Sequence, residues 1–155
     1  MRFSVQSIRR DLDLTTGDSA VYQSGGSYGK IRRELATRRI IGYEVHHIPS
    51  KAVVKRWGST YSLPAIALLK EDHAKTDSFR YKSRIKHESF LPDVAVSSSY
   101  IDQAKERIGV AQLFELIRIE LLNIRDQCGH KYDGAISQYL DALEAYILKH
   151  DYPQL

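Results

Sequence analysis

The sequence has very little cysteine and no long apolar run, and each absence narrows the class of protein. Cys128 is the single cysteine among 155 residues, so neither an internal disulfide nor a four-thiolate zinc site can form. The longest apolar run, Ala65 to Leu69, has five residues, whereas a membrane-spanning helix needs about 20. No apolar stretch of about 7 to 15 residues follows the early positive charge at the N-terminus. We therefore expect no membrane segment, no signal peptide and a reducing compartment.

Charge is divided unevenly along the chain. Residues 1–100 contain 17 Lys and Arg against 10 Asp and Glu, a net charge of +7, and residues 101–155 contain 6 against 9, a net charge of −3. These values sum to the overall +4. The basic part predicts a surface for a polyanion, and the acidic part predicts a scaffold or a surface for a basic partner. An ordinary solvated surface with uneven charge is the alternative.

Hydrophobic periodicity and turn residues predict one α+β domain in three parts. Residues 1–26 are rich in Asp, Ser, Thr and Gly and are expected to be a linker or an N-terminal arm. Residues 27–100 are expected to form the core of the domain. Residues 101–155 contain two amphipathic patterns, which predict a C-terminal helical hairpin packed on the same domain.

Within the predicted core, a helix is expected over residues 28–39 with Ser27 as its N-cap. A strand is expected over residues 41–48, because β-branched and aromatic residues there are followed by Pro49. The apolar run at 65–69 predicts a buried strand that leads into a helix over residues 70–78.

Two adjacent histidines, His46 and His47, lie at the end of the first predicted strand. Neighbouring side chains on a strand face opposite ways, so the two imidazoles need separate tasks unless the strand bends at Pro49. A third histidine, His73, lies four residues before Asp77, and on a helix that spacing suits two ligands of one metal. Asp72 is an alternative metal ligand or a helix cap.

Three segments together resemble the HNH and endonuclease VII superfamily of metal-dependent nucleases, and in particular its bacterial toxin branch. They are Tyr43-Glu44-Val45-His46-His47-Ile48-Pro49-Ser50, Leu63-Pro64-Ala65-Ile66-Ala67-Leu68 and Asp72-His73. The resemblance covers about residues 24–79 and implies a ββα-metal core with flanking helices.

By this resemblance, His46 and His73 hold the metal, His47 is the general base and Glu44 is an accessory catalytic group. The sequence departs from the family pattern because no Asn occupies the central segment, where Ser59, Thr60 or Ser62 would have to orient the base.

The implied chemistry is hydrolysis of DNA phosphodiester bonds without marked sequence preference. It requires one divalent ion, and imidazole and carboxylate ligands accept Mg, Mn, Ni or Zn. The resemblance also implies a toxin that a specialised secretion system delivers, within a larger secreted carrier polypeptide, into the cytoplasm of a target cell. Its producer would hold a cognate immunity protein.

A basic stripe follows the third histidine. Arg80, Lys82, Arg84 and Lys86 alternate with other side chains, so an extended conformation would align all four cations for contact with phosphates. Two other functions compete with the DNase. One is a non-catalytic module that binds nucleic acid or a protein partner, and the other is an RNase on the same scaffold.

Overall fold

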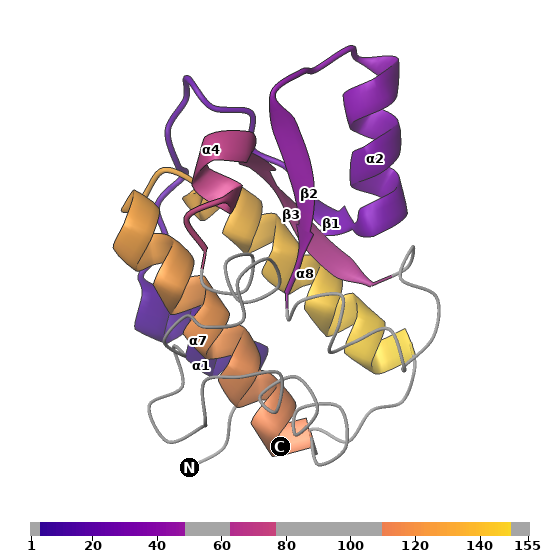
Figure 1. Cartoon of the computed structure of the whole chain (residues 1–155). Helices are drawn as coiled ribbons and strands as arrows, with labels where there is room; N and C mark the ends of the chain where they lie inside the picture. Colours follow the sequence, from indigo (N-terminus) through magenta and orange to yellow (C-terminus); the bar gives the residue numbers. More distant parts are fainter. Residues whose placement is uncertain (1–3, 49–62, 77–109, 150–155) are drawn as a thin grey trace, which may run out of the picture.

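The computed structural model describes residues 4–48, 63–76 and 110–149, and Figure 1 shows how they are arranged. This part of the chain combines helices with a three-stranded antiparallel sheet in the order β1-β3-β2, which confirms the predicted α+β class. The elements are α1 (Val5–Leu12), β1 (Gly25–Ser27), α2 (Tyr28–Thr37), β2 (Tyr43–His47), β3 (Pro64–Leu69), α4 (Lys70–His73), α7 (Val110–Cys128) and α8 (Asp133–Lys149).

The central strand β3 is buried on both faces, as its continuous apolar sequence predicts. Ile66 and Leu68 point into the large core shared with α1, α7 and α8. Ala65 and Ala67 point the other way, into a smaller core with Ile31 of α2. The sheet is therefore a middle layer with α2 on one side and the other long helices on the opposite side, and its edge strands are β1 and β2.

Helix α2 begins as the sequence predicts. The Ser27 side chain accepts a hydrogen bond from the backbone N–H of Lys30 at 3.3 Å, which satisfies a donor in the first helical turn. The helix ends at Thr37, two residues before the end of the predicted range. Arg39, just beyond it, has a φ of 52°, a left-handed conformation that turns the chain back towards β2.

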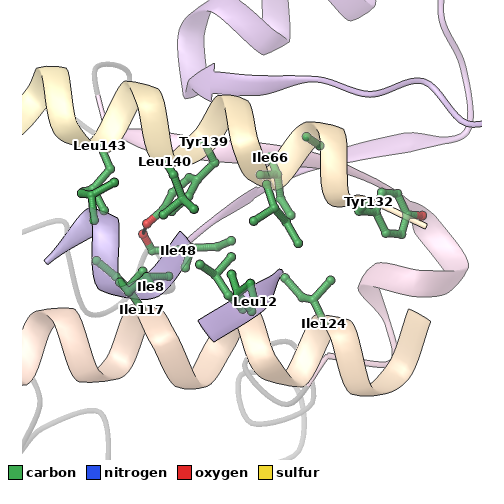
Figure 2. Close-up of a cluster of buried hydrophobic side chains, with 14 of the residues drawn as sticks. Ile8, Leu12, Ile48, Ile66, Ile117, Ile124, Tyr132, Tyr139, Leu140 and Leu143 are labelled. Atoms are coloured by element: carbon green, nitrogen blue, oxygen red, sulfur yellow. Dashed lines mark hydrogen bonds between the residues drawn. The ribbon is translucent and has the colours of Figure 1, made fainter. Parts of the chain in front are cut away.

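Helices α7 and α8 follow one another in the segment where the sequence predicts a C-terminal helical hairpin, and both contribute to the large core. Figure 2 shows side chains of α7 and α8 directed into a common core, with Ile8, Leu12 and Ile48 between the two helices. Gly129 has a φ of 61° and ends α7, as a glycine after a helix commonly does. Of residues 101–155, which the sequence assigns to this hairpin, residues 101–109 and 150–155 lie outside the described ranges. Within those ranges, no helix has the length and apolar character needed to cross a bilayer.

The N-terminal segment differs from the expected linker or arm. Ser4 and Ser7 form a reciprocal capping box at the start of α1, and Val5, Ile8 and Leu12 of that helix are buried in the large core. The spacing of three and four residues places these apolar side chains on one face. Helix α1 is thus an integral part of the domain, and Figure 2 shows Ile8 and Leu12 between the longer helices.

Candidate functional site

Strand β2 sends its two adjacent histidines to opposite faces of the sheet. His46 is paired in register with Ile66, and Glu44 with Leu68, so both side chains share the face that packs on the large core. His47 is paired with Ala65 and faces α2. Since β2 includes both histidines, no bend occurs between them, and the alternation of a regular strand decides their directions.

Helix α4 follows β3 without a gap and brings His73 next to His46. The His73 Nε2 and His46 Nδ1 atoms are 3.2 Å apart, and the ring centroids are separated by 4.8 Å. The second nitrogen of His73, Nδ1, lies 3.1 Å from the Glu44 Oε1 atom. The structure therefore brings together Glu44, His46 and His73 from two elements that are separated in the sequence.

A fourth side chain, Glu120 of α7, completes this group. Its Oε1 atom lies 3.7 Å from His46 Nε2, and the two side chains are only 4% and 5% exposed. At the other end, Glu44 is 43% exposed. We call the four side chains Glu44, His73, His46 and Glu120 the histidine row, which extends from the protein interior to the surface.

Each imidazole in the histidine row directs one nitrogen towards a carboxylate and the other towards the second imidazole. A neutral imidazole has one N–H and one lone pair. With the N–H of each ring on the side of its carboxylate, the two nitrogens that face each other present lone pairs.

That arrangement of lone pairs fits two ligands of a metal ion. Histidine ligands usually donate their other ring N–H to a carboxylate, and Glu44 and Glu120 stand in the corresponding positions. The 3.2 Å between the facing nitrogens is close to the roughly 3.3 Å expected for two ligands of a tetrahedral zinc ion. Among residues 4–48, 63–76 and 110–149, no group of three or more His, Cys, Asp and Glu side chains is arranged to hold a metal. The described residues thus supply two ring nitrogens, and water, substrate or other residues would supply the rest.

Asp72 has a different environment from its neighbour His73. Its carboxylate is buried and accepts hydrogen bonds from Lys131 Nζ at 2.7 Å, the Tyr132 hydroxyl at 2.5 Å and Lys75 Nζ at 3.3 Å. Both carboxylate oxygens are therefore occupied within the protein. These contacts fasten α4 to the turn between α7 and α8. The N-cap position of α4 is Leu69 and not Asp72, and the role of Asp72 as a metal ligand stays a prediction.

His47 is buried against α2. Its ring stacks on the ring of Tyr28 with centroids 4.4 Å apart and planes 10° from parallel. Its predicted role as general base remains a prediction. Asp77 and the basic stripe of Arg80, Lys82, Arg84 and Lys86 lie outside the described residues.

A cleft of about 470 Å³ lies between α2 and the free edge of β2. We call it the α2–β2 cleft. Three successive residues of β2, Tyr43, Glu44 and Val45, line it, and α4 contributes Lys70 and His73. The exposed part of the histidine row borders the cleft.

Glu120 is the member of the histidine row that the sequence reasoning missed. A signal was present, because Glu120 follows Ile117 by three residues and precedes Ile124 by four, so it occupies the apolar stripe of its helix. A carboxylate in such a stripe is rarely buried unless it is paired. No protein-family model, curated protein or solved structure matches this chain.

Proposed function

We propose that this protein is a metal-dependent endonuclease that hydrolyses DNA phosphodiester bonds with little sequence preference. The observation that carries the proposal is the pair of imidazole nitrogens 3.2 Å apart in the histidine row, each ring backed by a carboxylate. The order of elements is also that of a ββα-metal core, since β2 pairs with β3 and α4 follows β3 directly.

In this proposal His46 Nδ1 and His73 Nε2 hold one divalent ion, and the ligand chemistry accepts Mg, Mn, Ni or Zn. The ion, when bound, supplies positive charge that stabilises the phosphate and leaving oxygens of the transition state. Glu44 orients the His73 ring by accepting its remaining N–H, and Glu120 lies 3.7 Å from the remaining nitrogen of His46.

His47 is proposed to accept the proton of the attacking water, a contribution of about 10²- to 10⁴-fold. Its position on the opposite face from His46 is compatible with this role because β2 is an edge strand. Tyr28, on which His47 stacks, lines the same cleft as His73. The support for this role is that the stacking partner of His47 lines the cleft, although His47 itself is not a lining residue.

The biological setting is proposed on the resemblance alone. It comprises a toxin delivered into a target cell by a larger secreted carrier polypeptide, with a cognate immunity protein in the producing cell. The choice of DNA over RNA as the substrate is part of this proposal and is tested by offering both nucleic acids.

The test combines cleavage with metal binding. Supercoiled plasmid and total RNA are incubated separately with Mg²⁺, Mn²⁺, Ni²⁺ or Zn²⁺ and with a chelator. We expect metal-dependent plasmid cleavage by the natural protein, and its loss in His46→Ala and His73→Ala together with weaker metal binding by calorimetry. His130→Ala is the matched control, since that histidine is 55% exposed and lies outside the histidine row.

A separate variant tests whether His47 is the general base. His47→Ala should retain metal affinity and fold while losing cleavage. Cleavage of RNA alone would identify an RNase. Nucleic-acid binding without cleavage of either substrate, under every metal, would refute the nuclease and support the non-catalytic binding module.

A further inference from the structure

The α2–β2 cleft has the chemistry of a nucleotide site. Its volume of about 470 Å³ lies within the range of about 300–1,000 Å³ that is typical of sites for small ligands. Tyr28, Leu35 and Val45 give it an apolar and aromatic lining, and Arg32 and Lys70 add two positive charges from different elements. Apolar surface for a base and cations for phosphates are the two requirements for binding a nucleic-acid strand without reading its sequence.

We propose that the cleft receives one unpaired nucleotide of a DNA strand, with Arg32 and Lys70 binding phosphates of that strand. The protein then binds single-stranded DNA more tightly than the same sequence in duplex form. The inference rests on the proposed function, because that function identifies the occupant as a nucleic acid and places the reacting phosphate near His73.

The two cations are positioned for this task. The Arg32 guanidinium donates a hydrogen bond to the Tyr28 hydroxyl at 3.0 Å and lies 5.7 Å from the centre of that ring. This contact holds the guanidinium beside an aromatic ring. The backbone N–H of Lys70 donates to the Gly42 carbonyl at 2.9 Å, which fixes the base of the Lys70 side chain beside the start of β2.

Glu44, the carboxylate in the lining of the α2–β2 cleft, does not cancel the positive charge of the cleft. Glu44 Oε1 lies 3.1 Å from His73 Nδ1, so its negative charge is directed to an imidazole N–H. The remaining charged lining residues are Arg32 and Lys70. The cleft thus favours an anion, and the anion enters next to the exposed end of the histidine row.

The size of the cleft separates single-stranded from duplex substrates. A duplex presents its bases inside a stack, and its major groove alone is about 12 Å wide, so its bases reach such a cleft only after being unstacked at a cost of a few kcal/mol. An unpaired strand enters without that cost. A preference of at least about tenfold for the single strand is therefore expected.

The test measures binding of fluorescent oligonucleotides by anisotropy in the presence of chelator, so that no cleavage interferes. Arg32→Gln and Lys70→Gln are each expected to weaken single-strand binding about tenfold, as the loss of a charged hydrogen bond implies. The double variant should lower the slope of log affinity against log salt by about 1.4, or 0.7 per phosphate contact. Arg33→Gln is the matched control, because Arg33 is exposed on the same helix but does not line the cleft.

A second variant tests whether filling the α2–β2 cleft blocks binding of the single strand. Ala36 lines the cleft and is exposed on α2, so Ala36→Glu should place bulk and negative charge in the cleft without disturbing the fold. Thr37→Glu adds the same charge at the next residue, outside the lining, and should have a much smaller effect.

The outcomes separate this inference from the proposed function. Equal binding of single-stranded and duplex DNA, or equal effects of Arg32→Gln and Arg33→Gln, would overturn the inference even if the protein cleaves plasmid. A single-strand preference that depends on Arg32, Lys70 and Ala36 would support it even if no metal yields cleavage, and the nuclease proposal alone would then fail.

Discussion

Asp72 gives the sharpest prediction, because it connects the stability of the domain to the position of a site residue. The side chain lies directly before His73 and is buried beneath Lys131 and Tyr132. The variant Asp72→Asn keeps the shape of the side chain and removes its charge. We expect it to destabilise the domain and to loosen α4, which carries His73.

The magnitude follows from the contacts. Hydrogen bonds to a charged group are worth about 1.5–3 kcal/mol each. Lys131 and Lys75 have side chains 30% and 55% exposed. Both ammonium groups can therefore return to water in the variant, which reduces the contribution of their contacts to the free energy of unfolding. The asparagine can still accept from Tyr132. We therefore expect a loss of about 2 kcal/mol in the free energy of unfolding at pH 7.

The effect depends on pH in a defined direction. Burial by itself raises the pKa of Asp72, but hydrogen bonds from Lys131 and Tyr132 outweigh it, so the pKa lies below its ordinary value. The stabilisation is then complete above the unfolded-state pKa of about 3.9 and disappears as the pH falls through the lower folded-state pKa. The difference between the natural protein and Asp72→Asn should be constant from about pH 5 to 7 and shrink below about pH 4.

The assay is urea unfolding at several pH values, combined with metal titration at pH 7. Metal affinity should fall about tenfold in Asp72→Asn, since the loosened helix holds His73 less firmly. Lys75→Gln is the control and should cost less than about 0.5 kcal/mol, because it removes only an exposed partner. An Asp72→Asn variant as stable as the natural protein at pH 7 would refute the anchoring role.

Three further changes test other parts of the structure. Gly25→Ala should destabilise the domain by more than about 2 kcal/mol, measured by urea unfolding, because the added Cβ would lie 2.6 Å from the backbone nitrogen of Tyr139. Ile8→Ala should cost about 2–5 kcal/mol if α1 belongs to the core, and an unchanged midpoint would restore the expectation of a loose arm. Glu120→Gln should weaken metal binding about 10- to 100-fold by calorimetry, whereas undiminished affinity would remove Glu120 from the site.

Elements with a strong period or a clear cap could be predicted from the sequence. Two apolar stripes, one that includes Ile117 and one that includes Leu140, predicted the two C-terminal helices, and Ser27 predicted the start of α2. Helix α1 was missed because it is only eight residues long and lies among turn-forming residues, although Val5, Ile8 and Leu12 have helical spacing. Short helices are stabilised by packing more than by propensity, so their sequence signal is weak.

The candidate site was predictable only where its residues share an element. Glu44 and His46 are two apart on one strand, so their common face follows from the period of two. The contact of His73 with that face depends on how β3 pairs with β2, and the contact of Glu120 depends on how α7 packs. Both are tertiary arrangements that local patterns do not determine.

The burial of His46 and Glu120 bears on whether the histidine row is structural or functional. Two ionisable side chains in an apolar core carry a desolvation cost of several kcal/mol, and apolar residues of similar size at such positions are often neutral or stabilising by about 1–4 kcal/mol. Packing alone therefore gives little reason for a carboxylate between Ile117 and Leu121 on the inward face of α7. The row also ends at Glu44, which is 43% exposed and borders the α2–β2 cleft. A polar path that starts in the core and opens into a cationic cleft therefore supports the proposed ion-dependent reaction on an anionic substrate more than a purely structural role.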